Sequence, residues 1–142
     1  MLKGIPDILS PELLKILMEM GHGDEIVIAD GNFPKMAHGE NVVRLDAHGV
    51  CEILEAVLKF FPLDPYVENP VTLMEVVKGD DFIPVIWDDY KKIIKNAEGK
   101  DTGIEYEKRF EFYDRAAKAY ATVATGEKSL YANIILKKGV VK

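Results

Sequence analysis

The stretch Glu25-Ile26-Val27-Ile28-Ala29-Asp30 decides the fold that this sequence predicts. Its four apolar residues are consecutive rather than alternating, which is typical of a strand buried on both faces of a parallel sheet. A helical pattern precedes it, because Ser10 and Pro11 suit an N-cap and a first helical position, and Gly21 supplies the stop. The stretch therefore predicts a buried strand that follows a helix.

Helical and extended patterns keep alternating along the rest of the chain. In the first helix, Leu13, Leu14, Leu17 and Met18 are expected on one apolar face. Further helices are expected over residues 48–61, 83–97 and 107–119, and further strands over residues 42–45, 71–77, 122–125 and 134–136. This alternation predicts an α/β fold, a three-layer sandwich with a mostly parallel central sheet, in a single domain over residues 1–142.

Composition and charge narrow the class of protein. The apolar content of 48% is ample for a core at this length, and Cys51 is the only cysteine, so no intramolecular disulfide can form. Its apolar surroundings at helical spacing predict that Cys51 fills the core and is not a nucleophile. The net charge of −6, with dispersed basic residues, argues against binding to nucleic acid or to an anionic membrane surface.

Several other kinds of site and location are excluded by what the sequence lacks. No apolar run has membrane-spanning length and the first residues lack a signal-peptide pattern, so a cytoplasmic protein is expected. No phosphate-loop or Gly-x-Gly-x-x-Gly pattern is present, so no nucleotide cofactor is expected. His22, His38 and His48 lack the spacing of a helical zinc motif, so no metal site is expected. For His38 and His48, surface or capping roles are favoured.

His22 is the first candidate for chemistry. It lies between Gly21 and Gly23 in the connection from the first helix to the first strand, where the glycines leave its imidazole uncrowded. An imidazole in such a place can act as a general acid or base near neutral pH. The alternative is a histidine favoured by the negative end of the preceding helix.

Two aspartates are candidates, each with a structural alternative. Asp30 follows the predicted central strand, at the kind of strand end where ligands gather in open α/β sheets. Asp64 lies between two prolines in Pro62-Leu63-Asp64-Pro65. Either could instead be an aspartate that caps a turn. A strand also separates His22 from Asp30, so they share one site only if the loop before the strand folds back or a neighbouring subunit completes the site.

The C-terminal third combines aromatic, amide and guanidinium groups. Arg109 and Tyr113 are four residues apart and share one helical face, whereas Phe110 and Phe112 are expected in the core. Tyr131 and Asn133 are two apart, and so lie on one side of an extended segment. Such groups suit a small ligand with many hydroxyl groups, because aromatic rings stack on a sugar while Asn and Arg bind its hydroxyls. A structural ion pair for Arg109, and a turn at residues 131–133, are the alternatives.

From Leu2 to Val140 the sequence resembles the family of L-fucose mutarotases and D-ribose pyranases. The matching blocks are Ser10-Pro11-Glu12-Leu13-Leu14, Met20-Gly21-His22-Gly23-Asp24-Glu25-Ile26, Asp30 with Phe33-Pro34, Arg44-x-Asp46, Leu63-Asp64-x-Tyr66, Arg109 to Ala116, and Thr125-Gly126-Glu127-x-x-x-Tyr131-x-Asn133. No block is decisive by itself, but their order and spacing together are specific. Phe33-Pro34 and Phe112-Tyr113-x-Arg115 resemble the fucose branch.

The resemblance implies a cofactor-free sugar epimerase that acts at the anomeric carbon. It implies an α/β subunit assembled into a ring, a decamer, with sites in clefts between neighbours, and it implies that His22 is the proton donor. Substrate-binding positions of the family match Asp30, Arg109, Tyr131, Asn133 and the backbone at Ala132, where many fucose-type members have Gly. Asp64 and Tyr113 match positions implicated in mammalian-like members. We expect Asp64 to act with His22 in catalysis and Tyr113 to bind the substrate.

The expected activity is therefore exchange of the α and β anomers of L-fucose. The chemistry needs one acid and one base, with either Asp30 or Asp64 orienting His22 or a sugar hydroxyl. A D-ribose pyranase, a sugar-binding module without turnover and an assembly protein with a vestigial site are the alternatives. Ribose and galactose are the alternative sugars.

Overall fold

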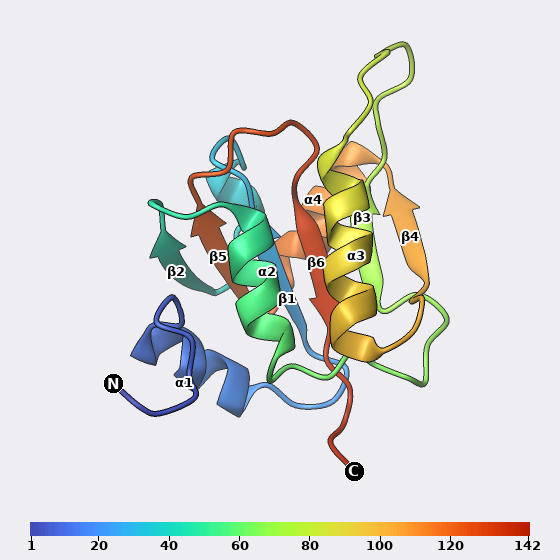
Figure 1. Ribbon diagram of the computed structural model, residues 1–142. Coiled ribbons are helices and arrows are strands. Elements are labelled where there is room, and N and C mark those ends of the chain that lie inside the picture. Colours follow the sequence, from blue (N-terminus) through green and yellow to red (C-terminus); the bar gives the residue numbers. More distant parts are fainter.

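One six-stranded sheet runs through the computed structural model, which describes all 142 residues (Figure 1). In chain order the elements are α1 (Pro11–Glu19), β1 (Glu25–Ala29), the 3-10 helix η1 (Lys35–Ala37), β2 (Asn41–Leu45), α2 (Val50–Leu58), β3 (Val71–Met74), α3 (Ile86–Glu98), β4 (Ile104–Glu107), α4 (Arg109–Ala117), β5 (Ala121–Thr125) and β6 (Ile134–Lys137). None of the helices has the length and apolar composition needed to cross a membrane.

The sheet is mostly parallel, as the sequence predicts. Its strand order is β2-β5-β1-β6-β3-β4, and only β6 runs antiparallel to its two neighbours, β1 and β3. Because β6 is reversed, its first residues lie beside the last residues of β1, where Ile134 pairs with Ile28.

The central strand β1 is buried on both faces, which confirms the three-layer prediction. Ile26 and Ile28 pack into the larger core, under α1, α2 and α3. Val27 and Ala29 pack into the smaller core, with Phe112 of α4. Figure 1 shows α2 and α3 in front of the sheet and α4 behind it. Consecutive apolar residues are needed because no face of this strand meets solvent.

The structure differs from the sequence-based expectations in α1 and around β4. Met18 is 84% exposed, and Ile16 instead shares the buried face of α1 with Leu13 and Leu17. Residues 104–107 form the edge strand β4, which went unrecognised because two of its four residues are glutamates. The helix expected from residue 107 therefore begins only at Arg109.

The glutamates of β4 are explained by an ion cluster around Arg115. The Arg115 guanidinium donates to Glu25 over 2.7 and 3.0 Å, and to Glu105 and Glu107 over 2.6 Å each. Its side chain is 22% exposed and that of Glu25 is 14% exposed. One arginine of α4 thus binds carboxylates of both β1 and β4, and so ties the helix to the sheet.

Arg115→Met should lower the free energy of unfolding by about 3 kcal/mol, because removing one partner strands half-buried carboxylates without their counter-charge. Urea unfolding followed by circular dichroism measures this loss. The matched control is Arg44→Met, since Arg44 also pairs at 2.6 Å, with Asp46, but both side chains are more than half exposed. The control should leave the midpoint unchanged. Equal effects of the two substitutions would contradict a special role for the buried cluster.

The same cluster predicts a pH dependence. Burial raises the pKa of Glu105, but the hydrogen bonds from Arg115 and Thr72 outweigh it and hold that pKa below its ordinary value. A carboxylate with a depressed pKa in the folded state stabilises fully above its unfolded pKa, about 4.3, and loses this contribution as the pH falls through the folded value. The stability gap between the wild type and Arg115→Met should therefore narrow below about pH 4.

Candidate active site

Asp30 and Asn133 form a reciprocal pair at the carboxyl end of β1. The Asp30 N–H donates to Asn133 Oδ1 over 2.7 Å, and Asn133 Nδ2–H donates to Asp30 Oδ2 over 3.0 Å. Both residues are buried. The antiparallel direction of β6 makes this pair possible, because it brings the residue before β6 beside the residue after β1.

Asp30 also caps the turn that follows β1. Its Oδ1 accepts the Asn32 N–H over 2.9 Å, so the turn alternative considered from the sequence is correct as well. Burial raises the pKa of Asp30, although hydrogen bonds from Asn32 and Asn133 act in the opposite direction. Turn formation and pairing with Asn133 use different carboxylate oxygens, so the two roles coexist.

A hollow of about 210 Å³ opens over this pair. It is lined by five of the residues selected from the sequence, namely Asp30, Arg109, Tyr113, Tyr131 and Asn133, together with Asn32, Phe33, Met74, Val77, Asp80 and Leu130. Arg109 and Tyr113 share a face of α4 as expected, with the guanidinium 5.6 Å from the ring centre. Arg109 makes no ion pair, so the structural alternative for it fails and its donors are free for a ligand.

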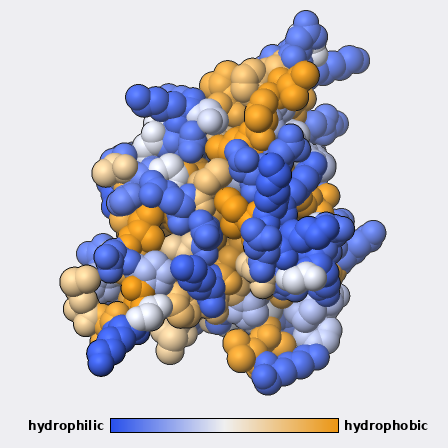
Figure 2. All heavy atoms as spheres, viewed as in Figure 1, coloured by the Kyte–Doolittle hydropathy of each residue, from blue (hydrophilic) through white to orange (hydrophobic).

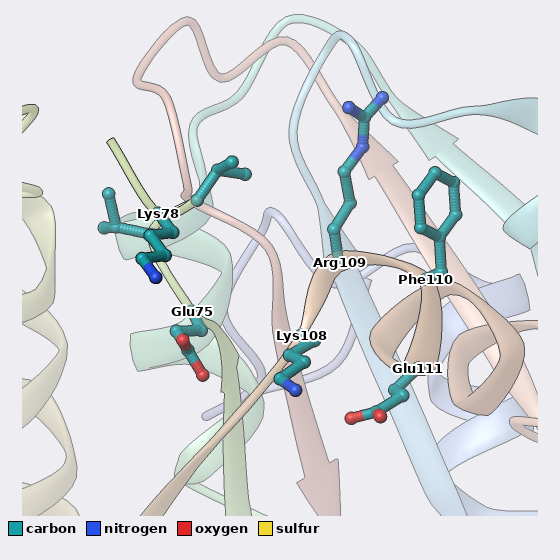
Figure 3. Close-up of a pocket in the computed structure, with 8 residues that line it drawn as sticks. Glu75, Lys78, Lys108, Arg109, Phe110 and Glu111 are labelled. Carbon is teal, nitrogen blue, oxygen red and sulfur yellow. The ribbon is translucent and has the colours of Figure 1, made fainter. Parts of the chain in front are cut away.

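A larger hollow, of about 470 Å³, shares Val77 and Arg109 with the first. Its walls are residues 75–78, after β3, and residues 108–111, at the start of α4. In Figure 3 the Arg109 side chain extends away from Lys108 and Glu111. Phe110 in this wall is 72% exposed, so its expected place in the core is wrong, whereas Phe112 is fully buried as expected.

Tyr131 lies in a turn and not in the extended segment that the sequence suggested. Its φ is +56°, and β6 begins only at Ile134. Its hydroxyl donates to Asp80 Oδ2 over 2.6 Å, and its ring stacks on Phe82 with centroids 5.8 Å apart. Asp80 could not be identified from the sequence beyond its place in a Gly-Asp-Asp turn, because its partner is 51 residues away. The neighbouring Ala132 is buried, and its carbonyl accepts the Tyr90 hydroxyl over 2.6 Å.

His22 and Asp64 form a second group. His22 Nε2 lies 3.2 Å from Asp64 Oδ1, with the Tyr66 ring 5.5 Å from the imidazole. The Asp64 carboxylate is only 4% exposed, whereas the His22 side chain is 47% exposed. Of the two aspartates considered from the sequence, Asp64 is thus the one that contacts His22. Asp64 Oδ1 also accepts the Tyr66 N–H over 3.0 Å, so Asp64 caps a turn too.

The protonation of this pair follows from its contacts. Burial raises the pKa of Asp64, but the Tyr66 N–H and the His22 ring outweigh it and hold that pKa below its ordinary value. An ionised carboxylate only accepts hydrogen bonds, so His22 Nε2 carries the proton that it donates to Asp64. In the neutral imidazole Nδ1 is then unprotonated, and it can accept a proton from a ligand.

The two groups lie at opposite ends of the sheet. The loop before β1 is held to the end of β6, where the Gly23 N–H donates to the Lys138 carbonyl and the Asp64 N–H donates to the Lys137 carbonyl. Asn133 precedes the start of that strand. The five residues of β1, about 16 Å of strand, separate His22 from Asp30. The loop does not fold back, so one chain does not bring the two groups together.

The remaining histidines and the cysteine have structural contacts. His38 stacks on Phe33, and His48 Nδ1 lies 3.2 Å from Glu52 Oε1 beside the start of α2. Burial raises the pKa of the half-buried Cys51 thiol to about 11, which suits the inert role expected for it. No group of three or more His, Cys, Asp or Glu side chains is arranged to hold a metal ion.

Known proteins resemble this chain along nearly its whole length. Residues 3–141 match the model of the RbsD / FucU transport protein family. The chain is 49% identical over 140 residues to an L-fucose mutarotase of Actinobacillus pleuropneumoniae, covering 99% of this chain and 97% of that protein. It is 50% identical to the human fucose mutarotase, covering 99% and 94%. The crystal structure of the fucose mutarotase from Streptococcus pneumoniae in complex with L-fucose superimposes with a TM-score of 0.93 at 53% identity, covering 99% and 100%.

Proposed function

Because this chain belongs to the RbsD / FucU family, we propose that it is a mutarotase that interconverts the α and β anomers of L-fucose. The observation that carries the proposal is its likeness, at 53% identity over nearly the full length of both chains, to a fucose mutarotase solved with L-fucose. The hollow beside Asp30, at the end of the central strand, is the proposed sugar site.

The lining of this hollow suits a 6-deoxy sugar. Arg109 and Asn133 offer donors and Asp30 offers acceptors for sugar hydroxyls. Phe33 and Met74 add apolar surface, against which a methyl group can pack without leaving a polar group unpaired. A sugar with a hydroxymethyl group in place of that methyl would have to desolvate its hydroxyl there, so L-fucose is favoured over galactose.

The reaction opens and closes the sugar ring and needs only an acid and a base. A base removes the proton of the anomeric hydroxyl, an acid protonates the ring oxygen, and the bond between the anomeric carbon and the ring oxygen breaks. The aldehyde rotates, and the hydroxyl formed from the ring oxygen then adds to its other face. In this step the hydroxyl loses its proton and the aldehyde oxygen gains one. No atom is gained or lost. The unprotonated Nδ1 of His22 can take and return a proton, while Asp64 fixes the imidazole from its other side.

We further propose that each site combines His22 and Asp64 of one chain with the hollow of another. The separation of the two groups within one chain supports this arrangement. Exposed apolar side chains border both groups: Tyr66 packs beside His22, Val77 and Leu130 line the hollow, and Phe82 stacks on Tyr131. Figure 2 shows apolar side chains beneath the charged tip of the loop that precedes α3. A ring, the decamer expected from the resemblance, would repeat one such contact around a closed assembly.

Saturation-transfer NMR on the wild-type protein tests the activity. Irradiating the anomeric proton of one L-fucose anomer should attenuate the signal of the other anomer, far more strongly with the protein than without it. Galactose and ribose are run in parallel. Fucose exchange that exceeds the rates with the other two sugars is the expected result.

Other outcomes of this experiment identify the alternatives. Acceleration of the pyran–furan exchange of ribose alone would show a pyranase, and fucose affinity without any acceleration would show a sugar-binding module.

The ring is tested by measuring the mass of the native assembly. The cytoplasmic location expected from the sequence is part of the same proposal and is tested by cell fractionation.

A further inference from the structure

Two side chains of α3 hold the backbone beneath the proposed sugar site. The Trp87 indole N–H donates to the Tyr131 carbonyl over 2.8 Å, and the Tyr90 hydroxyl donates to the Ala132 carbonyl over 2.6 Å. Trp87 and Tyr90 are three residues apart and therefore lie on one face of the helix. Neither lines the hollow. Both act on main-chain atoms of the segment that presents Tyr131 and Asn133 to a ligand.

The residue that Trp87 holds has an unfavourable backbone conformation. Tyr131 is the only non-glycine residue of the chain with a positive φ, at +56°. In this left-handed region the Cβ crowds the carbonyl oxygen, so a bulky residue stays there only when its surroundings fix it. The indole N–H is a fixed donor on a half-buried ring that also packs on Tyr106, with centroids 5.2 Å apart.

Tyr131 is held from its side-chain end as well. Its hydroxyl donates to Asp80, and its ring stacks on Phe82, both in the segment that leads into α3. Residues 80–90 therefore fix the ring of Tyr131, the Tyr131 carbonyl and the Ala132 carbonyl. If the backbone relaxed to negative φ, the ring would swing away from Asp80 and from the hollow.

We infer that Trp87 and Tyr90 are positioning residues for the sugar site: they keep Tyr131 in its left-handed conformation, and so aim its ring and the Asn133 amide at the ligand. The inference rests on the proposed function. It assigns to α3, which has no residue in the hollow, a role in sugar affinity. Proton transfer is left to His22, on a separate part of the chain.

Trp87→Phe tests this inference, because it removes the indole donor, with part of the ring volume, and keeps an aromatic ring on Tyr106. The loss of one neutral hydrogen bond corresponds to a rise in KM for L-fucose of about two- to tenfold. The value of kcat should stay within about twofold, since no group that moves protons is altered. Exchange NMR over a range of fucose concentrations gives both constants, and calorimetry gives the affinity independently. An unchanged KM and an unchanged affinity would overturn the inference.

A double-mutant cycle separates positioning from a general loss of stability. In a Tyr131→Ala background there is no ring left to aim, so adding Trp87→Phe should change KM little further. If the effect of Trp87→Phe were as large in that background as in the wild type, Trp87 would not act through Tyr131. Tyr106→Leu is the matched control: it replaces the ring against the same indole with another apolar side chain and leaves the indole donor in place. That control should keep the KM of the wild type.

The outcome for the wild type keeps this inference distinct from the proposed function. If the wild type neither accelerates fucose exchange nor binds fucose, the proposed function is wrong and the positioning role falls with it. If the wild type is active and Trp87→Phe has the same KM, only the positioning role is wrong.

Discussion

His22→Ala loses about 10²–10⁴-fold of the enzymatic acceleration of fucose anomer exchange while the protein stays folded, because general acid–base catalysis contributes about that much. The imidazole is half exposed and its one polar contact is with Asp64, so its removal leaves no cavity in either core. The remaining rate should come from sugar binding alone. Exchange NMR measures the rate, and circular dichroism verifies the fold.

The chain offers a close control for this substitution. His48 also lies 3.2 Å from a carboxylate, that of Glu52, and its side chain is 37% exposed. His48→Ala removes the same type of histidine–carboxylate contact at a place without a proposed role in the chemistry. We expect exchange at the wild-type rate for His48→Ala. A His22→Ala protein as active as the wild type would refute the assignment of the proton shuttle.

Two inactive variants should restore activity when they assemble together. Arg109→Ala impairs the hollow and His22→Ala impairs the proton shuttle, so each protein alone is nearly inactive. In mixed assemblies a site is intact when the His22 group comes from an Arg109→Ala chain and the hollow comes from a His22→Ala chain. For random assembly of equal amounts, about a quarter of the sites are intact, so about a quarter of the wild-type activity should return.

Co-expression of the two chains with different affinity tags, followed by tandem purification, gives the mixed assemblies. Exchange NMR on them measures the recovery. The control pairs His22→Ala with Asp64→Asn: both changes affect the same group, so every site has a damaged His22 group and no recovery is expected. If His22→Ala with Arg109→Ala recovered no more activity than this control, sites shared between chains would be excluded.

Much of the architecture could be predicted from local patterns. The apolar stretch after Glu25 gave a strand buried on both faces, and spacing gave all four helices within a few residues. The strand β4 could not be predicted, because its glutamates are paired with Arg115, a contact that no local pattern reveals. Met18 and Phe110 were misplaced because a helical stripe does not specify where its edge meets the core.

The candidate residues were predicted, but their grouping was not. Sequence alone left open whether Asp30 or Asp64 accompanies His22, because both are turn aspartates beside apolar segments. The fold decides for Asp64, since the reversed direction of β6 brings the segments of residues 22 and 64 to one end and Asp30 with Asn133 to the other. Trp87, Tyr90 and Asp80 could not be found from the sequence, because their partners lie 42 to 51 residues away.

The amino-acid order by itself determined which segments are strands and helices and which side chains can exchange protons or bind hydroxyls, since both follow from residue types and short spacings. The tertiary structure alone decided which of those side chains meet. Contacts between distant segments depend on strand order and direction. Here the single antiparallel strand β6 brings Asn133 beside Asp30 at one end of the sheet, and β1 separates them from the imidazole at the other end.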